Sequence, residues 1–215
     1  MQLKIRRVKT TPSTKLSIEK SLESKPARYP ITQTTVKPVY IEAGKKNCTF
    51  EDIFAGKTIP KFAAFTLVTQ TAFRGTYNQQ PFSFKHQDLV SLKLSFGSDS
   101  YPSPEFRPLY TSTNEEDWTR EYYALMMQTF KSDSANFITY ELFKSHYAIY
   151  VIELGQFSLT SNDHVTPKRN MTARLDIDFL QSRANQPALV GLLYAEWDSE
   201  IQITSARNVL RDYIL

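Results

Sequence analysis

The chain has 215 residues, of which 41% are hydrophobic, 13% aromatic and 22% charged. These fractions argue against a disordered chain, and the aromatic content favours strands over helices. Cys48 is the only cysteine, so the sequence excludes an intramolecular disulfide and a metal cluster held by several thiolates.

The positive charge of the chain lies at its N-terminus. The net charge is +4, but residues 1–28 hold eight Lys or Arg and two Glu, and the rest of the chain is slightly acidic. Such a segment could contact nucleic acid or another acidic surface, and the candidate contacts are Lys4, Arg6, Arg7 and Lys9. A solvated strand and linker is the alternative, because no aromatic side chains alternate with these charges to stack on bases.

The sequence offers no apolar stretch of membrane-spanning length. The N-terminal residues have no apolar signal core, and the longest apolar run, at 187–195, is about half the length that spans a bilayer. We therefore expect neither secretion by a cleaved signal nor membrane insertion.

The N-terminal third predicts mostly extended structure. In chain order, we expect a short strand at 3–8, a break at 10–13, a short helix at 16–22, an extended segment at 29–41, a turn or single helical turn at 48–54, and a buried strand at 61–69. Pro30 and Pro38 make the segment at 29–41 an edge strand or a bent one.

The middle of the chain combines one clear strand with one clear helix. Strict alternation of apolar and polar residues predicts a half-exposed strand at 90–96, and the Ser- and Pro-rich segment at 97–108 predicts a loop. Residues 113–130 predict a helix whose apolar stripe contacts the core, and 139–144 a shorter helix.

The C-terminal part predicts further strands. They lie at 147–152, 171–179, 188–197, 200–204 and 209–215, with Asp198-Ser199 as a two-residue turn of a tight hairpin. The total of eight or nine strands predicts an all-β fold: a jelly-roll β-sandwich of about eight antiparallel strands with one inserted helix. An immunoglobulin-type sandwich fits less well, because it lacks the long segment between Phe96 and Tyr147.

The motifs of common enzyme sites are absent from the sequence. Gly56-Lys57-Thr58 ends like a phosphate-binding loop, but Glu51 occupies the first glycine position, and no Gly-x-Ser-x-Gly motif is present. Asp176 and Asp178 point to one face of a strand and could share a divalent cation, or Arg174 could neutralise them. We favour the second alternative and expect no enzymatic activity, no catalytic residue, no cofactor and no metal.

Eight short stretches together resemble a known family. They are LKIRRVK at 3–9, ARYPI at 27–31, FRGTYN at 73–78, PFSFKH at 81–86, RLDIDF at 174–179, YAEW at 194–197, IQI at 201–203 and RNVL at 207–210. Their order and spacing resemble the C-terminal half of capsid-like proteins from Maverick/Polinton elements and adintovirus-like DNA viruses. These proteins are similar to double jelly-roll major capsid proteins.

The resemblance implies a structural subunit of an icosahedral shell. Residues 1–28 would be a basic terminal strand and connector, and 29–215 the second jelly-roll domain of a major capsid protein. The implied partners are the chain itself, as a trimer or larger ring, and other capsid proteins, in the virion and inside the host cell during assembly. Alternatives are a single jelly-roll minor capsid (penton) protein, a jelly-roll module that binds glycans or a receptor through Tyr101 and Tyr110, and nucleic-acid binding by residues 1–28.

The aromatic segment after the buried strand supplies candidate subunit contacts. Phe73, Tyr77, Phe82 and Phe84 lie there, and aromatic side chains bury much area at an interface for little loss of conformational entropy. The alternative is that these rings fill the domain's own core.

Overall fold

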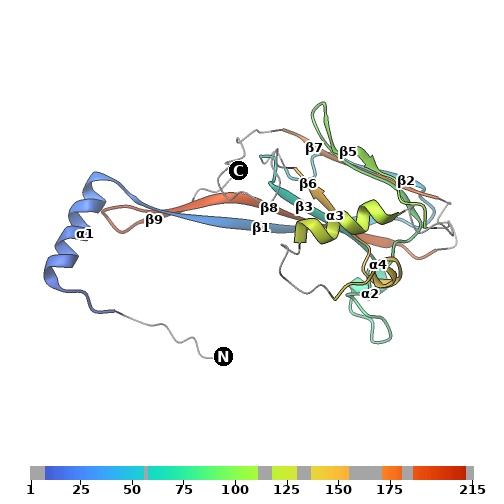
Figure 1. Cartoon of the computed structure of the whole chain (residues 1–215), viewed down its shortest axis with the longest axis horizontal. Helices are drawn as coiled ribbons and strands as arrows, with labels where there is room; N and C mark the ends of the chain where they lie inside the picture. The colour runs from blue at the N-terminus through green and yellow to red at the C-terminus, as the bar shows by residue number, and fades with distance from the viewer. Residues whose placement is uncertain are drawn as a thin grey trace. The chain divides into compact units, whose positions relative to one another are not determined.

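The structure is a computed structural model that describes residues 8–55, 58–110, 118–129, 137–154, 171–180 and 186–211 (Figure 1). The helices are α1 (Pro12–Ser24), α2 (Gln70–Phe73), α3 (Thr119–Thr129) and α4 (Tyr140–His146). The strands are β1 (Ala27–Ile41), β2 (Asn47–Phe50), β3 (Phe62–Thr69), β4 (Leu89–Phe96), β5 (Asp99–Phe106), β6 (Ile149–Glu153), β7 (Ala173–Phe179), β8 (Leu189–Ile203) and β9 (Val209–Arg211).

The strand order is that of a jelly roll. One antiparallel sheet has the order β1-β8-β3-β6, with β9 paired to β8, and the other has the order β2-β7-β4-β5. Along the chain, β1 therefore returns to pair with β8, β2 with β7, β3 with β6 and β4 with β5. One long hairpin rolled into two sheets gives this arrangement, so the predicted all-β jelly-roll class is confirmed.

The chain divides into two compact units. Unit 1 comprises residues 1–32 and 198–214, and unit 2 comprises 33–197 with residue 215. Strands β1 and β8 contribute residues to both units, and the sandwich core lies in unit 2.

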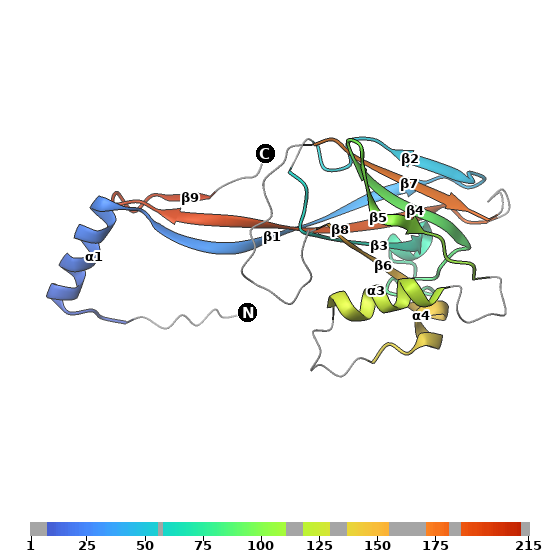
Figure 2. The ribbon, with the colours of Figure 1, turned by 45° about the horizontal axis from the view of Figure 1, so that its top comes forward.

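Alternating side chains of the two sheets build that core. Phe65 and Leu67 of β3 and Leu92 and Leu94 of β4 are fully buried, and the two sheets lie as separate layers (Figure 2). In β7 the alternation is as predicted, with every second residue from Ala173 to Phe179 buried. In β4 an irregular register between Leu89 and Ser91 places Leu89 in the core where the pattern had suggested Val90.

Several predicted elements are wrong. Residues 47–50 form β2 rather than a turn, since their partner β7 supplies the hydrogen bonds that a four-residue strand cannot supply itself. The expected loop at 97–108 contains β5, whose prolines are tolerated because this strand lies at the sheet edge. The described residues also include the short helix α2 at Gln70–Phe73, which the sequence had not indicated.

The predicted hairpin turn at Asp198-Ser199 is also wrong, because β8 runs through it to Ile203. The chain turns instead between Thr204 and Asn208, where Arg207 has a φ of 59°. The N–H of Arg207 donates to the carbonyl of Thr204 at 2.8 Å, and the N–H of Thr204 donates to the carbonyl of Asn208 at 3.0 Å.

Helix α1 begins where the sequence had suggested a break. The Thr11 side chain accepts a hydrogen bond from the N–H of Thr14, and Pro12 occupies the first turn, where it has no N–H to lose. The predicted helix at 16–22 is thus confirmed and extended. The predicted strand at 3–8 lies almost wholly outside the described residues.

Within unit 2, a stack of aromatic rings runs from the segment before β4 to α4. His86 stacks on Tyr110, Tyr110 on Trp118, and Trp118 on Tyr140, with centroid distances of 4.2, 5.9 and 5.3 Å. The Lys144 ammonium lies 4.0 Å from the centroid of the Trp118 ring. The stack joins the segment before β4, the segment after β5, Trp118 just before α3, and α4. Leu125 of α3 is buried as well, so the apolar stripe predicted for the longer helix does contact the core.

Candidate assembly surfaces

The first candidate surface begins at the last residue of α2 and covers most of the connection to β4. We call it the aromatic loop (residues 73–84). Phe73, Tyr77 and Phe82 are exposed, and Tyr77 makes almost no contact with the rest of the chain. Phe84 differs, because it is half-buried against Val68 and Val190. The structure therefore brings three of the four predicted contact residues to the surface and gives the fourth a packing role.

Hydrogen bonds at both ends hold this loop. The Thr69 and Thr71 hydroxyls donate to Oε1 of Gln79 at 3.0 and 2.6 Å. At the other end, the N–H of Phe84 donates to the carbonyl of His146 at 2.7 Å, and the N–H of Ala148 donates to the carbonyl of Phe84 at 2.9 Å. The exposed rings are thus displayed by a restrained segment.

The aromatic loop is followed by a tight turn that depends on His86. Gln87 and Asp88 both have positive φ, at 53° and 54°, which is costly for side chains other than glycine. The N–H of Leu89 donates to the carbonyl of His86 at 3.1 Å, and the N–H of Asp88 donates to His86 Nδ1 at 3.0 Å. Burial lowers the pKa of His86, Asp88 raises it and Lys144 lowers it.

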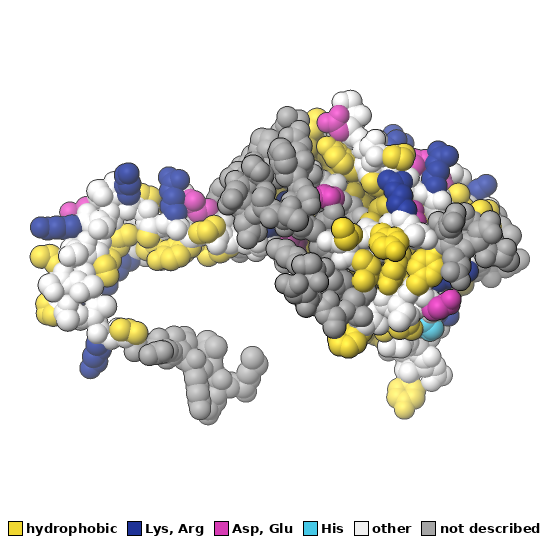
Figure 3. Space-filling model, viewed as in Figure 1, with side chains coloured by type: hydrophobic (Ala, Val, Ile, Leu, Met, Phe, Trp, Pro, Cys, Tyr) yellow, Lys and Arg dark blue, Asp and Glu magenta, His cyan; other side chains and the backbone are white. Residues whose placement is uncertain are grey.

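The second candidate surface is on the helical segment between β5 and β6. We call it the insert surface and define it by Tyr123 and Met127 of α3, Phe137, and Leu142 of α4, all exposed. Tyr123 and Met127 are four residues apart on α3 and so share one face of the helix. Figure 3 shows hydrophobic side chains gathered on the face where α3 and α4 lie.

The third candidate surface is in unit 1, which contains the predicted basic segment. Lys9 is exposed, whereas Lys4, Arg6 and Arg7 lie outside the described residues. Helix α1 buries none of its residues. The Arg207 guanidinium lies 3.3 Å from Glu19 of this helix, and the Arg28 guanidinium lies 3.8 Å from Glu200.

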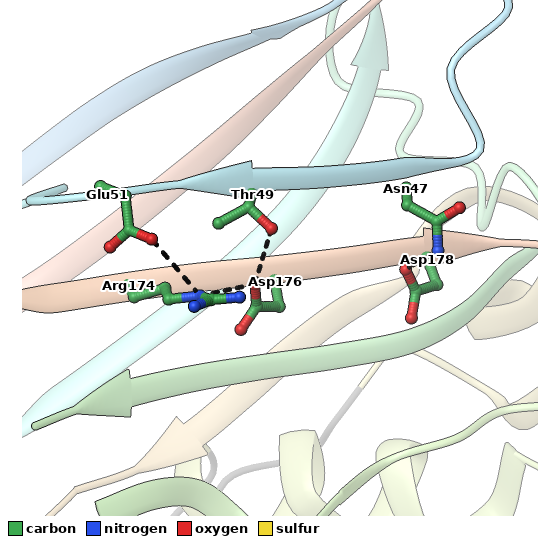
Figure 4. A network of polar contacts seen from close by, with 6 residues as sticks. All are labelled: Asn47, Thr49, Glu51, Arg174, Asp176 and Asp178. Atoms are coloured by element: carbon green, nitrogen blue, oxygen red, sulfur yellow. Dashed lines mark hydrogen bonds and ion pairs between the residues drawn. The ribbon is translucent and has the colours of Figure 1, made fainter. Parts of the chain in front are cut away.

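Side chains of β2 and β7 hydrogen-bond the acidic pair on β7 (Figure 4). Arg174 Nε donates to Asp176 Oδ1 at 2.9 Å, and the Thr49 hydroxyl donates to the same oxygen at 2.8 Å. Asn47 Nδ2 donates to Asp178 Oδ1 at 2.6 Å. The hydrogen bond to Asp176 raises the pKa of Arg174. Arg174 therefore neutralises Asp176, whereas Asp178 accepts its hydrogen bond from a neutral amide.

Three buried ionisable groups of unit 2 have pKa values raised by burial. The hydroxyls of Tyr110 and Tyr150 lie 3.0 Å apart, and burial raises the pKa of both phenols, so they stay protonated at physiological pH. Burial also raises the pKa of Glu121. Tyr110 is only 6% exposed, so it cannot be the outer aromatic residue expected for glycan binding.

Comparisons with known proteins give one curated relative and several structural likenesses. No family model matches the chain. An uncharacterized protein of Caenorhabditis elegans is 24% identical over 199 residues, which are 90% of this chain and 46% of that protein. The chain thus spans about half the length of this relative.

None of the helices within the described ranges is long and apolar enough to cross a membrane.

The structural likenesses are to viral capsid proteins. A chain of the Sputnik virophage structure is 12% identical, with 88% of this chain and 39% of that chain covered and a TM-score of 0.49. The mavirus major capsid protein is 10% identical, with 89% and 42% covered and a TM-score of 0.41. The PBCV-1 capsid model gives 9% identity, 87% and 52% coverage and a TM-score of 0.43. Because these TM-scores are low, the jelly-roll assignment is based on the strand order of this chain itself.

Proposed function

We propose that this chain is a structural subunit of a capsid-type shell, which associates with copies of itself and catalyses no reaction. The observation that carries the proposal is a jelly roll with exposed aromatic side chains on restrained surface segments. Two packed sheets supply a rigid body, and the connections between strands supply surfaces for neighbours. The collinear sequence stretches described above support the same role.

More specifically, we propose that the chain is the second jelly roll of a major capsid protein of the Maverick/Polinton or adintovirus-like type. Residues 29–215 form the jelly-roll domain in this proposal, and 1–28 form the strand and connector before it. The match to only 46% of the length of the curated relative supports a place within a longer protein. A single jelly-roll penton protein is the alternative. The proposed location is the virion, with the host cell interior during assembly.

The exposed rings of the aromatic loop are the proposed subunit contacts. The rings are exposed to solvent and are not packed in the core of their own chain, so their surface is available to a neighbouring subunit. They belong to Phe73, Tyr77 and Phe82. Phe84 anchors the loop by packing beneath it against Val68 and Val190. The proposed partners are further copies of the chain, in a trimer or larger ring, and other capsid proteins.

Light scattering coupled to size-exclusion chromatography tests the proposal. The purified chain at rising concentration should give a mass that increases to a defined multiple of 24.8 kDa. Negative-stain microscopy of the same fractions should show rings or trimers of one size. A single-chain mass at every concentration would contradict self-assembly.

A further inference from the structure

The turn that leads from the aromatic loop into β4 combines a costly backbone with a titratable side chain. Gln87 and Asp88 both lie in the left-handed region of backbone space, which residues with a side chain adopt only when surrounding contacts hold them there. One such contact is the hydrogen bond of 3.0 Å from the N–H of Asp88 to Nδ1 of His86. The shape of this turn is therefore linked to the protonation state of an imidazole.

Both ends of the turn are fixed to the rest of unit 2. Before it, the N–H of Phe84 donates to the carbonyl of His146 at 2.7 Å. After it, Leu89 is buried in the core, and the carbonyl of Asp88 accepts the N–H of Leu180 at 2.9 Å. Because Leu89 would lose its core contacts by moving, a change in the turn displaces the Phe84 side, which is the end of the aromatic loop.

Two charged groups act on the imidazole from different elements. The carboxylate of Asp88, whose Oδ1 lies 3.5 Å from His86 Nδ1, favours the protonated form, and Lys144 of α4 opposes it. Burial is the largest influence and lowers the pKa of His86. The ring on which His86 stacks is uncharged, because burial raises the pKa of the Tyr110 phenol. The imidazole is therefore neutral at neutral pH and takes up its proton in acid.

Protonation reverses what Nδ1 does in the turn. With a hydrogen of its own, Nδ1 no longer accepts the N–H of Asp88, and two donors then face each other across 3.0 Å. The carboxylate of Asp88 offers the new N–H a different partner. The protonated imidazole thus favours a rearranged turn in which the positive φ angles are no longer held by this hydrogen bond.

We propose that His86 is an acid switch, whose protonation opens the turn, releases the C-terminal end of the aromatic loop and weakens the contact between subunits. This inference rests on the proposed function and adds the regulation of its contact. Helix α3 should respond differently, because Glu121 is buried with a raised pKa. Its protonation removes the cost of burying a charge, so acid should open the turn and leave α3 docked.

The switch is tested by variants that fix the turn in each state. In His86→Asn, Oδ1 occupies the place of Nδ1 on Cγ and accepts the N–H two residues further on, and it does not titrate. His86→Phe removes the acceptor altogether. The matched control is His146→Gln, because His146 is exposed and contributes its backbone carbonyl to the anchor of Phe84. Circular dichroism of each variant checks that the sandwich is folded.

Hydrogen exchange of the Asp88 and Leu89 amides measures the turn directly, after correction for the intrinsic exchange rate at each pH. The opening constant in wild type and His146→Gln should rise about fivefold or more between about pH 7.5 and about pH 5, because the open turn binds the proton more tightly. It should stay low in His86→Asn and be raised at both pH values in His86→Phe. Wild-type turn amides that ignore pH, or an equal rise in His86→Asn, would overturn the inference.

Self-association of the same proteins measures the consequence for assembly. The dissociation constant of wild type should rise about fivefold or more over the same pH interval, and that of His86→Asn should change less. A turn that opens in acid without weaker association would overturn the inference and leave the proposed function in place. A wild-type chain that is monomeric at about pH 7.5 would overturn the proposed function, whatever the turn amides show.

Discussion

The imidazole of His86 lies face to face with the phenol ring of Tyr110, with centroids 4.2 Å apart and planes inclined by 19°. In this position His86 Nδ1 accepts the N–H of Asp88 across a turn whose two central residues have positive φ. A protonated Nδ1 could not accept that bond. The turn at the end of the aromatic loop therefore depends on a neutral histidine.

The free energy of unfolding should fall as the pH drops below about 6.5, the ordinary pKa of histidine. The pKa of His86 is lowered in the folded chain, chiefly by burial, so the unfolded chain takes up the proton first. This contribution is fully present above the unfolded pKa and is lost as the pH falls toward the folded one. Urea unfolding of wild type and His86→Phe between pH 5 and 8 measures it.

The His86→Phe variant should keep the ring stack and lose the part of the pH dependence that comes from His86, at a cost of about 1 kcal/mol for the missing hydrogen bond. Glu121 contributes in the opposite sense, because its pKa is raised by burial. The difference between the two proteins therefore isolates His86. Parallel stability curves for both proteins across this pH range would contradict the role given to the neutral imidazole.

Gly191→Ala should destabilise unit 2 by about 1–3 kcal/mol. A Cβ at this position would lie 2.7 Å from Phe65 Cε2 and 2.7 Å from Val39 Cγ2, closer than van der Waals contact. The double variant Gly191→Ala/Val39→Ala should recover part of the loss, since it removes one of the two clashing groups. Thermal unfolding of both variants provides the check, and an unchanged midpoint for Gly191→Ala would show that the side chains of Phe65 in β3 and Val39 in β1 pack less tightly over β8.

Substitution in the aromatic loop should separate assembly from stability. Phe73→Ser, Tyr77→Ser and Phe82→Ser together should weaken self-association by tenfold or more and change the unfolding free energy little, because these rings are exposed. Phe84→Ser should instead destabilise the chain by about 1–3 kcal/mol, because its ring packs against Val68 and Val190. If the triple variant assembled like wild type, the aromatic loop would not be a subunit contact.

Calcium or magnesium at millimolar concentration should leave the thermal midpoint unchanged, as should a chelator. The carboxylates of Asp176 and Asp178 are already hydrogen-bonded by Arg174, Thr49 and Asn47. Asp176→Asn should change stability by less than about 1 kcal/mol, because the network lies at the protein surface. A midpoint that rises with calcium in wild type, but not in Asp176→Asn, would restore the cation alternative.

The sequence could predict those strands whose pattern is set by their own residues. The strict alternation in β7 was assigned correctly, because one buried face imposes a period of two. The continuous apolar run in β3 was assigned correctly as a buried strand, since consecutive residues of this strand are buried. The jelly-roll class followed from the number of such strands and the absence of regularly spaced helices.

The remaining elements depend on partners far along the chain. Strand β2 exists because β7 pairs with it from Asn47 to Phe50, and β5 tolerates Pro102 and Pro104 because none of the described strands pairs with its outer edge. The length of β8 was missed because Asp198 and Ser199 are common turn residues, whereas pairing with β1 keeps them extended. Of the candidate contacts, sequence alone could not separate exposed Phe82 from half-buried Phe84, which lie two residues apart.

Sedimentation-velocity ultracentrifugation of the wild-type chain, from micromolar to near-millimolar concentration, tests the central claim most directly. A self-assembling shell subunit should shift from a slow species to one faster boundary with the mass of a small closed ring, and the aromatic-loop triple variant should shift only at higher concentration. A wild-type boundary that keeps the mass of one 24.8 kDa chain throughout would contradict the account.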